Sequence, residues 1–235
     1  MKMPPVVIIA GGLATRLYPL TLEIPKSMVE IAGKPFIHYQ LLMLRNNKIS
    51  DVVLCIGNLG SQIRDYVGNG SKWGMKVRYS YDGDKPLGTG GAIKKALSKL
   101  PSIFFIVYGD SYLDVDFGSV LQKFQSSNKP AILTIYHNKN NFDNSNIVFK
   151  DGEILKYSKV QSSEMEYIDY GLAIVKKEIF KDSSENVKFD LSETFNKLIS
   201  LKNIGAFEVK QRFYEIGSPK GLEDFRHYQP PVDRK

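Results

Sequence analysis

The sequence predicts an α/β fold in which a largely parallel sheet is covered by helices. Apolar runs of strand length recur at residues 6–10, 52–56, 77–81 and 103–108. Helical patterns lie between them at residues 35–46, 59–67 and 90–100. Because parallel strands need a crossover between them, this alternation indicates βαβ units with helices on both faces of the sheet.

The second half of the chain has a different pattern. Strand-like runs at residues 131–136, 147–150, 154–157 and 168–175 are separated by turn sequences such as Asp151-Gly152. Helical stretches follow at residues 190–201 and 220–228. We therefore expect one domain, with an N-terminal half (1–116) and a C-terminal half with a small β-rich excursion (117–228) that meet along one cleft, and a tail (229–235).

Composition narrows the class of protein. With 43% hydrophobic and 11% aromatic residues among 235, the chain can bury a sizeable core. The single cysteine, Cys55, excludes an intrachain disulfide, and its apolar neighbours predict a buried hydrophobe in a reducing compartment. The apolar run at residues 6–10 is too short for a signal or a membrane span, so we expect a cytoplasmic protein with no membrane partner.

The charge pattern argues against a nucleic-acid partner. The net charge of +7 comes from 32 basic and 25 acidic residues that are dispersed along the chain. Nucleic-acid-binding proteins usually concentrate lysine and arginine in a block or along one helix, and the sequence has no such block. The positive balance instead suits small anionic substrates.

The loop after the first apolar run carries two glycines and a cation, in the order Ala10-Gly11-Gly12-Leu13-Ala14-Thr15-Arg16-Leu17. Glycine lets backbone N–H groups approach phosphate oxygens, and the Arg16 guanidinium adds a planar fork of donors. Taken alone, a glycine pair is more often a tight turn, and Lys26 in the following Pro25-Lys26 would more often be a solvated loop lysine. The two cations together favour a phosphate-binding loop.

The segment from Ala10 to Tyr39, AGGLATRLYPLTLEIPKSMVEIAGKPFIHY, resembles the signature of the sugar nucleotidyltransferases, the nucleoside-diphosphate-sugar pyrophosphorylases. Its ordered pieces are Gly-Gly-x-x-Thr-Arg-Leu, Pro-Leu-Thr, Pro-Lys and Gly-Lys-Pro. The short chain and a later Leu-Gly-Thr-Gly-Gly-Ala motif are most similar to the heptose 1-phosphate guanylyltransferases and the N-acetylmuramate 1-phosphate uridylyltransferases. The resemblance implies a Rossmann-like sheet and transfer of a nucleoside monophosphate from a nucleoside triphosphate to a sugar 1-phosphate, with release of pyrophosphate.

The resemblance assigns the nucleotide contacts to two motifs. In the first motif, the nucleotide-binding residues would be Ala10, Gly11, Gly12, Leu13, Ala14 and Thr15, and the catalytic residues that grip the triphosphate would be Arg16 and Lys26. In the second motif, Leu87, Gly88 and Thr89 would open a helix beside the base; in isolation this run would be interpreted as a glycine-rich helix start. Ala14 stands where many members carry glycine, so we expect ordinary backbone dihedrals there.

The cofactor that the resemblance implies is Mg²⁺. Asp110 lies on a glycine turn after an apolar run and resembles the family's Gly-Asp metal motif, although an aspartate in this position is by itself more often a turn former. The second metal carboxylate of the family is the Asp of Asp-Ile/Val-Gly-Thr-Pro, which here is Glu215-Ile216-Gly217-Ser218-Pro219. Glutamate offers the same ligand oxygens but reaches one methylene further, so we expect a shift in the metal position or its coordination.

By the same resemblance, the residues that bind the sugar phosphate would be Asn146, Ser158, Lys159, Asp169 and Gly171. Lys159 matches the lysine of a Phe-x-Glu-Lys motif, whereas Ser158 replaces its glutamate. Asp169 replaces the asparagine of Asn-x-Gly, and Ser145-Asn146 replaces a Tyr-Gly. Each change alone could be an ordinary surface substitution, but together they predict an acceptor other than plain glucose 1-phosphate.

One alternative function stays open, a non-catalytic nucleotide-sugar-sensing regulatory subunit with the same fold. Such relatives usually lose the arginine, the lysine or the metal acids; Arg16, Lys26 and Asp110 favour an enzyme, while Glu215 favours the alternative. A dinucleotide-dependent dehydrogenase is excluded, because no Gly-x-Gly-x-x-Gly follows the first apolar run. We expect a monomer or homodimer whose partners are a nucleoside triphosphate and a sugar 1-phosphate.

Overall fold

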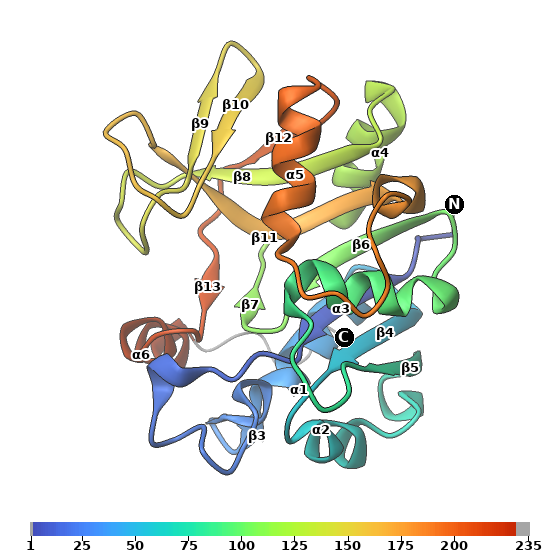
Figure 1. Cartoon of the computed structure of the whole chain (residues 1–235). Coiled ribbons are helices and arrows are strands. Elements are labelled where there is room, and N and C mark those ends of the chain that lie inside the picture. Colours follow the sequence, from blue (N-terminus) through green and yellow to red (C-terminus); the bar gives the residue numbers. More distant parts are fainter. Residues whose placement is uncertain (1, 229–235) are drawn as a thin grey trace.

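A mixed nine-stranded sheet forms the centre of the computed structural model, which describes residues 2–228 (Figure 1). The strands of this sheet are β1 (Val6–Ala10), β4 (Asp51–Ile56), β5 (Lys76–Tyr81), β6 (Ile103–Tyr108), β8 (Ala131–His137), β9 (Ile147–Lys150), β10 (Glu153–Tyr157), β11 (Tyr167–Lys176) and β12 (Gly205–Val209). Two further pairs of short strands are β2 (Glu30–Ile31) with β3 (Lys34–Pro35), and β7 (Ser111–Tyr112) with β13 (Tyr214–Glu215).

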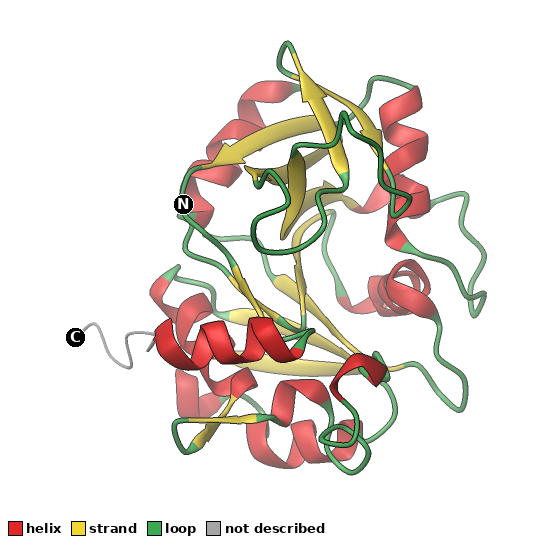
Figure 2. Cartoon of the chain, turned by 90° about the vertical axis from the view of Figure 1, so that its left-hand side faces the viewer, coloured by secondary structure: helices red, strands yellow, loops and turns green. Residues whose placement is uncertain are grey.

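The helices that flank the sheet are α1 (Phe36–Asn46), α2 (Gly60–Val67), α3 (Gly88–Ala96), α4 (Phe117–Ser127), α5 (Leu191–Ser200) and α6 (Pro219–Tyr228). Short 3-10 helices are η1 (Thr15–Leu17), η2 (Lys26–Met28), η3 (Ser71–Trp73), η4 (Leu97–Lys99) and η5 (Lys177–Phe180). Figure 2 shows helices on both faces of the strands.

The sheet combines a parallel region with an antiparallel extension. Strands β6, β1, β4 and β5 are parallel neighbours, and β12 runs parallel to β8. Strand β11 runs antiparallel to both β6 and β8 and pairs with β9, which forms a hairpin with β10. The prediction of an α/β fold with a mixed, mostly parallel sheet, flanking helices and a β-rich excursion is confirmed.

Each face of the sheet has its own hydrophobic core, because successive side chains of a strand point to opposite faces. On one face, Ile8 of β1 belongs to the core that contains Leu41 of α1. On the other face, Val7 and Cys55 belong to the core that contains Ile93 of α3. Cys55 is fully buried and burial raises the pKa of its thiol, so the prediction of a buried hydrophobe is confirmed.

The sequence patterns do not predict α4 or β12. Helix α4 begins at the N-cap Asp116, whose carboxylate accepts hydrogen bonds from the backbone of Gly118 and Ser119. Its apolar residues 117, 120, 121 and 124 are buried at helical spacing, but the glycine and serines between them have low helix propensity and obscure the signal. Strand β12 is defined by its parallel pairing with β8, which no local pattern reveals.

The end of the described chain returns to the N-terminal half, where α6 packs on α1 (Figure 1). Phe225 is fully buried, and its ring centroid lies 5.1 Å from that of Phe36 and 5.9 Å from that of Tyr39, both edge-on. The expected tail at residues 229–235 lies outside the described residues. Within residues 2–228, no helix is both long and apolar enough to cross a membrane.

Replacement of Phe225 by alanine is expected to lower the free energy of unfolding by about 3–5 kcal/mol, because a fully buried aromatic ring is lost and a cavity remains. Urea denaturation of the purified chain measures this change. The exposed Arg226 on the same helix provides the matched control, since Arg226→Ala should stay within about 0.5 kcal/mol of the parent. Equal stabilities for the two variants would contradict the packing described for α6.

Candidate active site

A cavity of about 170 Å³ lies at the carboxyl ends of the neighbouring parallel strands β1 and β6. Its walls are formed by Ile9, Ala10, Gly12, Lys26, Ser27, Thr89, Tyr108, Gly109 and Asp110. Open α/β sheets place ligands at this edge, since the loops after the strands diverge there. The structure therefore brings the glycine loop, the second glycine-rich motif and the Gly109-Asp110 turn to one site.

Lys26 and Asp110 form an ion pair inside this cavity. The Lys26 Nζ lies 2.8 Å from the Asp110 Oδ2, and both side chains are about one-fifth to one-quarter exposed, at 20% and 24%. Lys26 begins η2 directly after Pro25, and Asp110 lies between β6 and β7. The contact joins two motifs that are far apart in the sequence.

Arg16 and Glu215 approach the same point, next to Gly217. A Cβ atom added to Gly217 would collide with the Glu215 Oε2 and would lie 3.0 Å from the Asp110 Oδ2. It would also lie 2.9 Å from the Arg16 Nη2. The two carboxylates and the guanidinium thus lie close together around the α-carbon of Gly217.

Pairing between β7 and β13 holds the two carboxylates together. Glu215 is opposite Ser111 in this ladder, and the Ile216 N–H donates to the Asp110 carbonyl at 2.9 Å. Burial, followed by the charge of Asp110, raises the pKa of Glu215, while hydrogen bonds from Ser218 and Gly217 oppose the shift. The two acids therefore repel each other across a partly desolvated site.

This donor set fits a hard divalent cation. Carboxylate oxygens are preferred ligands of such ions, and Mg²⁺ is commonly held by one or two carboxylates together with substrate phosphates and water. A cation between Asp110 and Glu215 would also relieve their repulsion. Across residues 2–228 there is no group of three or more His, Cys, Asp or Glu side chains arranged to hold a metal.

A buried glutamine that the sequence analysis missed supports the Asp110 turn. Gln40 is completely buried, and its Nε2 donates to the Tyr108 carbonyl at 2.9 Å and to the Ser111 carbonyl at 2.8 Å. These two carbonyls flank the Gly109-Asp110 turn. The signal for Gln40 was a polar residue in the otherwise apolar helical run Gln40-Leu41-Leu42-Met43-Leu44.

The glycine loop differs from expectation at one position. Ala14 has φ 53° and ψ 40°, so the prediction of ordinary backbone dihedrals is wrong. Its carbonyl accepts hydrogen bonds from the Leu17 N–H at 3.0 Å and the Thr21 Oγ1 at 2.9 Å, which hold the left-handed turn. Alanine carries a cost of roughly 1–2 kcal/mol in this conformation.

The other residues of the glycine loop differ in their exposure to solvent. Gly11 is buried, and an added Cβ would lie 3.0 Å from the Asp82 Oδ2, whereas nothing lies within 4 Å of such an atom on Gly12. Leu13 is 48% exposed, and Thr15 is also exposed. Gly12 is therefore the glycine with open space for a ligand against its backbone.

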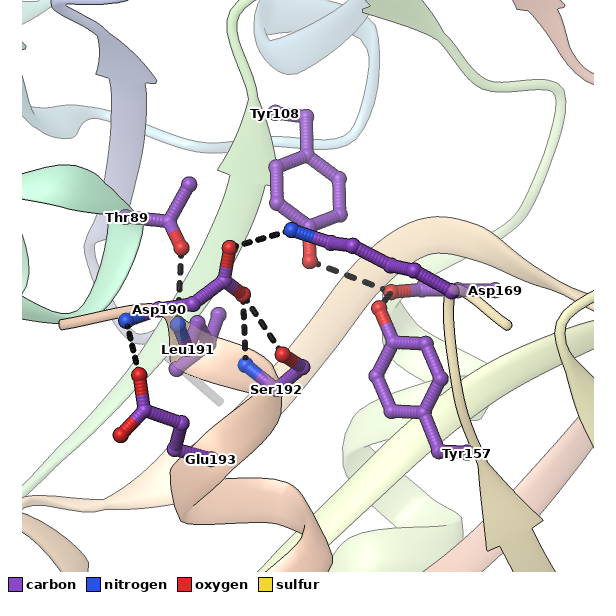
Figure 3. A network of polar contacts seen from close by, with 9 residues as sticks. Thr89, Tyr108, Tyr157, Asp169, Asp190, Leu191, Ser192 and Glu193 are labelled. Atoms are coloured by element: carbon purple, nitrogen blue, oxygen red, sulfur yellow. Dashed lines mark hydrogen bonds and ion pairs between the residues drawn. The ribbon is translucent and has the colours of Figure 1, made fainter.

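The second glycine-rich motif opens α3, as expected, but the chain itself uses the first helical amides. The Phe189 carbonyl accepts from the Gly90 N–H at 3.1 Å and the Gly91 N–H at 3.3 Å. In return, the Thr89 Oγ1 accepts from the Leu191 N–H at 2.8 Å, at the start of α5 (Figure 3). The N-termini of α3 and α5 thus cap each other, and Thr89 both lines the cavity and makes this contact.

Gly88 and Leu87 complete the motif. Gly88 has φ +71°, and an added Cβ would collide with the Phe189 carbonyl, so glycine is required both for the backbone and for the close approach. Leu87 is 6% exposed and its N–H donates to the Asp82 Oδ2 at 3.3 Å. Backbone geometry and packing therefore account for these two residues.

Three of the residues expected at the sugar phosphate belong to one polar network. The Asp169 Oδ2 accepts hydrogen bonds from the Tyr157 hydroxyl at 2.9 Å and the Tyr108 hydroxyl at 3.2 Å (Figure 3). The Asp169 Oδ1 accepts from the Gly171 N–H, and the Asp169 N–H donates to the Asn146 Oδ1, both at 2.9 Å. Tyr108 connects this network to the cavity.

Ser158 and Lys159 lie on a more exposed loop. The Lys159 Nζ lies 2.5 Å from the Asp190 Oδ2, and Asp190 is the N-cap of α5. The Ser158 Oγ accepts from the Val160 N–H at 3.0 Å. Neither residue lines the cavity between β1 and β6.

The nucleotidyl transferase family model matches residues 5–220. A D-glycero-alpha-D-manno-heptose 1-phosphate guanylyltransferase from Aneurinibacillus thermoaerophilus is 30% identical over 228 residues, which cover 94% of this chain and 98% of that protein. The enzyme of the same name from Campylobacter jejuni is 28% identical over 224 residues, with 94% and 97% covered. The crystal structure of HddC from Yersinia pseudotuberculosis complexed with GMP-PN has a TM-score of 0.79 and 28% identity, with 96% and 99% of the two chains covered.

The packing of α3 predicts the sign of a stability change. A Cβ added to Gly90 would collide with the Phe189 ring, so Gly90→Ala should lower the free energy of unfolding by about 1–3 kcal/mol through overpacking. Helix propensity alone would favour alanine by up to about 1 kcal/mol, so the two effects have opposite signs.

Gly12→Ala is the control for this experiment, because its added Cβ would meet nothing within 4 Å and its stability should match the parent. Thermal and urea unfolding provide the measurement. A more stable Gly90→Ala variant would mean that the α3–α5 contact is not as close as described.

Proposed function

Because the chain belongs to the nucleotidyl transferase family, we propose that it transfers a nucleoside monophosphate from a nucleoside triphosphate to a sugar 1-phosphate and releases pyrophosphate. It is a nucleotidyltransferase of nucleotide-sugar biosynthesis. The observation that carries the proposal is the grouping of the Lys26–Asp110 ion pair with Arg16 and Glu215 at the carboxyl ends of β1 and β6. The division of labour into a nucleotide half (1–116) and a sugar-phosphate half (117–228) is part of the same proposal.

The reaction is a displacement at phosphorus. An oxygen of the sugar phosphate forms a bond to the α-phosphorus while the bond between the α-phosphorus and the bridging oxygen to the β-phosphorus breaks. The attacking oxygen is already ionised near neutral pH, so no general base is needed. Catalysis then depends on positioning two anions and on neutralising the charge that develops on the departing pyrophosphate.

The side chains divide this work. Lys26 and Arg16 carry the positive charges that bind and stabilise the triphosphate, and the open backbone of Gly12 lies against the nucleotide. Asp110 and Glu215 hold Mg²⁺, which when bound supplies further neutralisation of phosphate charge. The Asp110–Lys26 pair also keeps the lysine directed into the cavity in the absence of substrate.

For the base we propose guanine, since two relatives that this chain matches over nearly their full length are both named guanylyltransferases. The cytoplasm, where nucleoside triphosphates are made, is the compartment that the proposal implies. A pyrophosphate-release screen of GTP, UTP, CTP and dTTP against a panel of sugar 1-phosphates tests it. Activity with no pair would overturn the proposal.

The regulatory alternative is not favoured. A sensing subunit has no need for the charged groups that transfer requires. Here Lys26 and Asp110 line one cavity, and the Arg16 guanidinium lies beside the same glycine as the Asp110 carboxylate. Glu215, which favoured that alternative in the sequence, lies beside Asp110 and offers the same carboxylate oxygens that an aspartate would. The substitution thus leaves a second acid in the site.

Replacement of Lys26 or Arg16 by alanine should reduce turnover by roughly 10²-fold or more, equivalent to about 3 kcal/mol of transition-state stabilisation. Steady-state pyrophosphate release measures the effect, and circular dichroism establishes that each variant is folded. Lys76→Ala removes an exposed lysine of β5 and should leave turnover unchanged. A folded Lys26→Ala chain with parental turnover would remove this residue from the mechanism.

Activity should require a divalent cation and disappear in excess chelator. Asp110→Asn should raise the Mg²⁺ concentration needed for half-maximal activity, because the amide is a neutral and weaker ligand than the carboxylate. Asp151→Asn makes the same chemical change at an exposed turn and should leave the Mg²⁺ dependence unaltered. Full activity in chelator would disprove the metal requirement, and an unchanged Mg²⁺ dependence in Asp110→Asn would exclude that ligand.

A further inference from the structure

The Tyr108–Asp169–Tyr157 contacts determine which hydrogen-bonding role each phenol can play. A phenol has a single proton, so a tyrosine that donates to a carboxylate retains only lone pairs for other partners. Tyr108 and Tyr157 both donate to the Asp169 Oδ2 (Figure 3). The Gly171 N–H donates to the Asp169 Oδ1. Each phenol therefore directs its only proton at the carboxylate, and its oxygen retains lone pairs for a further partner.

Only one of the two phenols is placed to meet a ligand. Tyr157 is 6% exposed and stacks on Phe195 with ring centroids 6.3 Å apart. Tyr108, by contrast, lines the cavity next to Lys26 and Asp110. Its backbone is fixed as well, since its carbonyl accepts from the buried Gln40 amide at 2.9 Å.

The order of the strands indicates which substrate Tyr108 faces. Tyr108 ends β6, which lies between β1 and β11 in the sheet. The glycine loop follows β1, whereas Asp169 is carried by β11 and Tyr157 by β10, on the opposite side of β6. Because its hydroxyl donates to Asp169 of β11, the phenol of Tyr108 is directed away from the strand that leads into the glycine loop.

We propose that Tyr108 is a specificity-determining residue for the sugar 1-phosphate: its hydroxyl, with its proton directed to Asp169, accepts a hydrogen bond from a hydroxyl of the sugar. This inference rests on the proposed function. Asp169 acts through Tyr108 as a positioning residue, which replaces the expectation of a direct contact between Asp169 and the sugar. The acceptor class is a sugar with a hydrogen-bond donor at that point, and a deoxy, fluoro or carboxylate group there is discriminated against.

The test uses the active nucleotide and acceptor pair with acceptor analogues in which each hydroxyl in turn is replaced by hydrogen or fluorine. Fluorine is close to a hydroxyl in size but cannot donate. At one sugar position, both analogues should lose roughly 10- to 100-fold in kcat/KM with the parent enzyme, because a hydrogen bond in a partly desolvated site is lost. Tyr108→Phe should lower kcat/KM for the natural acceptor to the level of these analogues and remove the discrimination.

Two further variants separate this role from a structural one. Tyr157→Phe deletes the other phenol that donates to the same carboxylate oxygen, and it should retain the discrimination. Asp169→Asn should weaken the discrimination, because the amide oxygen would accept from the Gly171 N–H and leave the NH2 group, a donor, facing the Tyr108 hydroxyl. KM for the nucleoside triphosphate should stay within about twofold of the parent. The inference can therefore be tested even if the Tyr108→Phe variant does not fold.

The contrary outcomes are distinct. Discrimination that persists in Tyr108→Phe, or the absence of any discriminating sugar position, overturns the inference but leaves the transferase function intact. The same comparison can be made with nucleoside triphosphates that lack the 2′- or 3′-hydroxyl of the ribose. If the parent discriminates against such a nucleotide and Tyr108→Phe does not, Tyr108 contacts the nucleotide, and the assignment to the acceptor is overturned. A parent enzyme that is inactive with every nucleotide and acceptor pair overturns the proposed function and this inference together.

Discussion

Repulsion between two carboxylates that the fold holds side by side is the constraint on which the site depends. Asp110 and Glu215 come together because β7 pairs with β13, and the raised pKa of Glu215 reflects both its burial and the charge of Asp110. The nearby cations Lys26 and Arg16 offset part of this charge. A divalent cation bound between the two carboxylates would relieve their repulsion, as the proposed function requires.

The close approach of the two carboxylates also accounts for two uncharged residues beside them, Gly217 and Gln40. Gly217 lies where an added Cβ would displace the ends of the Glu215 and Arg16 side chains, so a larger residue there would disturb the arrangement of the charged groups. Gln40 holds the two carbonyls that flank the Asp110 turn, which keeps the carboxylate in place although the turn is short. A buried amide bound to two backbone carbonyls is costly to replace, because each would lose its partner.

The two glycine-rich motifs serve different physical ends. Gly12 leaves open space at the cavity, whereas Gly90 and Gly91 permit close contact with the segment that precedes α5. The reciprocal caps at Thr89 and Phe189 therefore connect α3, which borders the cavity, to α5, whose N-cap pairs with Lys159. A motif that resembles a ligand-binding signature thus also contributes to the packing between the two halves.

The sequence by itself determined the α/β class and most of the elements, because side-chain periodicity and turn residues act over short stretches of chain. It also singled out Lys26, Asp110 and Glu215 as candidates through their motifs. Only the tertiary structure decided that Lys26, Asp110 and Glu215 lie close together and that the backbone of Ala14 is left-handed. It also decided that the Asp169 carboxylate accepts hydrogen bonds from two tyrosine hydroxyls. Strand β12 could not be predicted from the sequence either, since it is defined by its pairing with β8. These features arise from contacts between distant segments, and no local pattern in the sequence encodes such a contact.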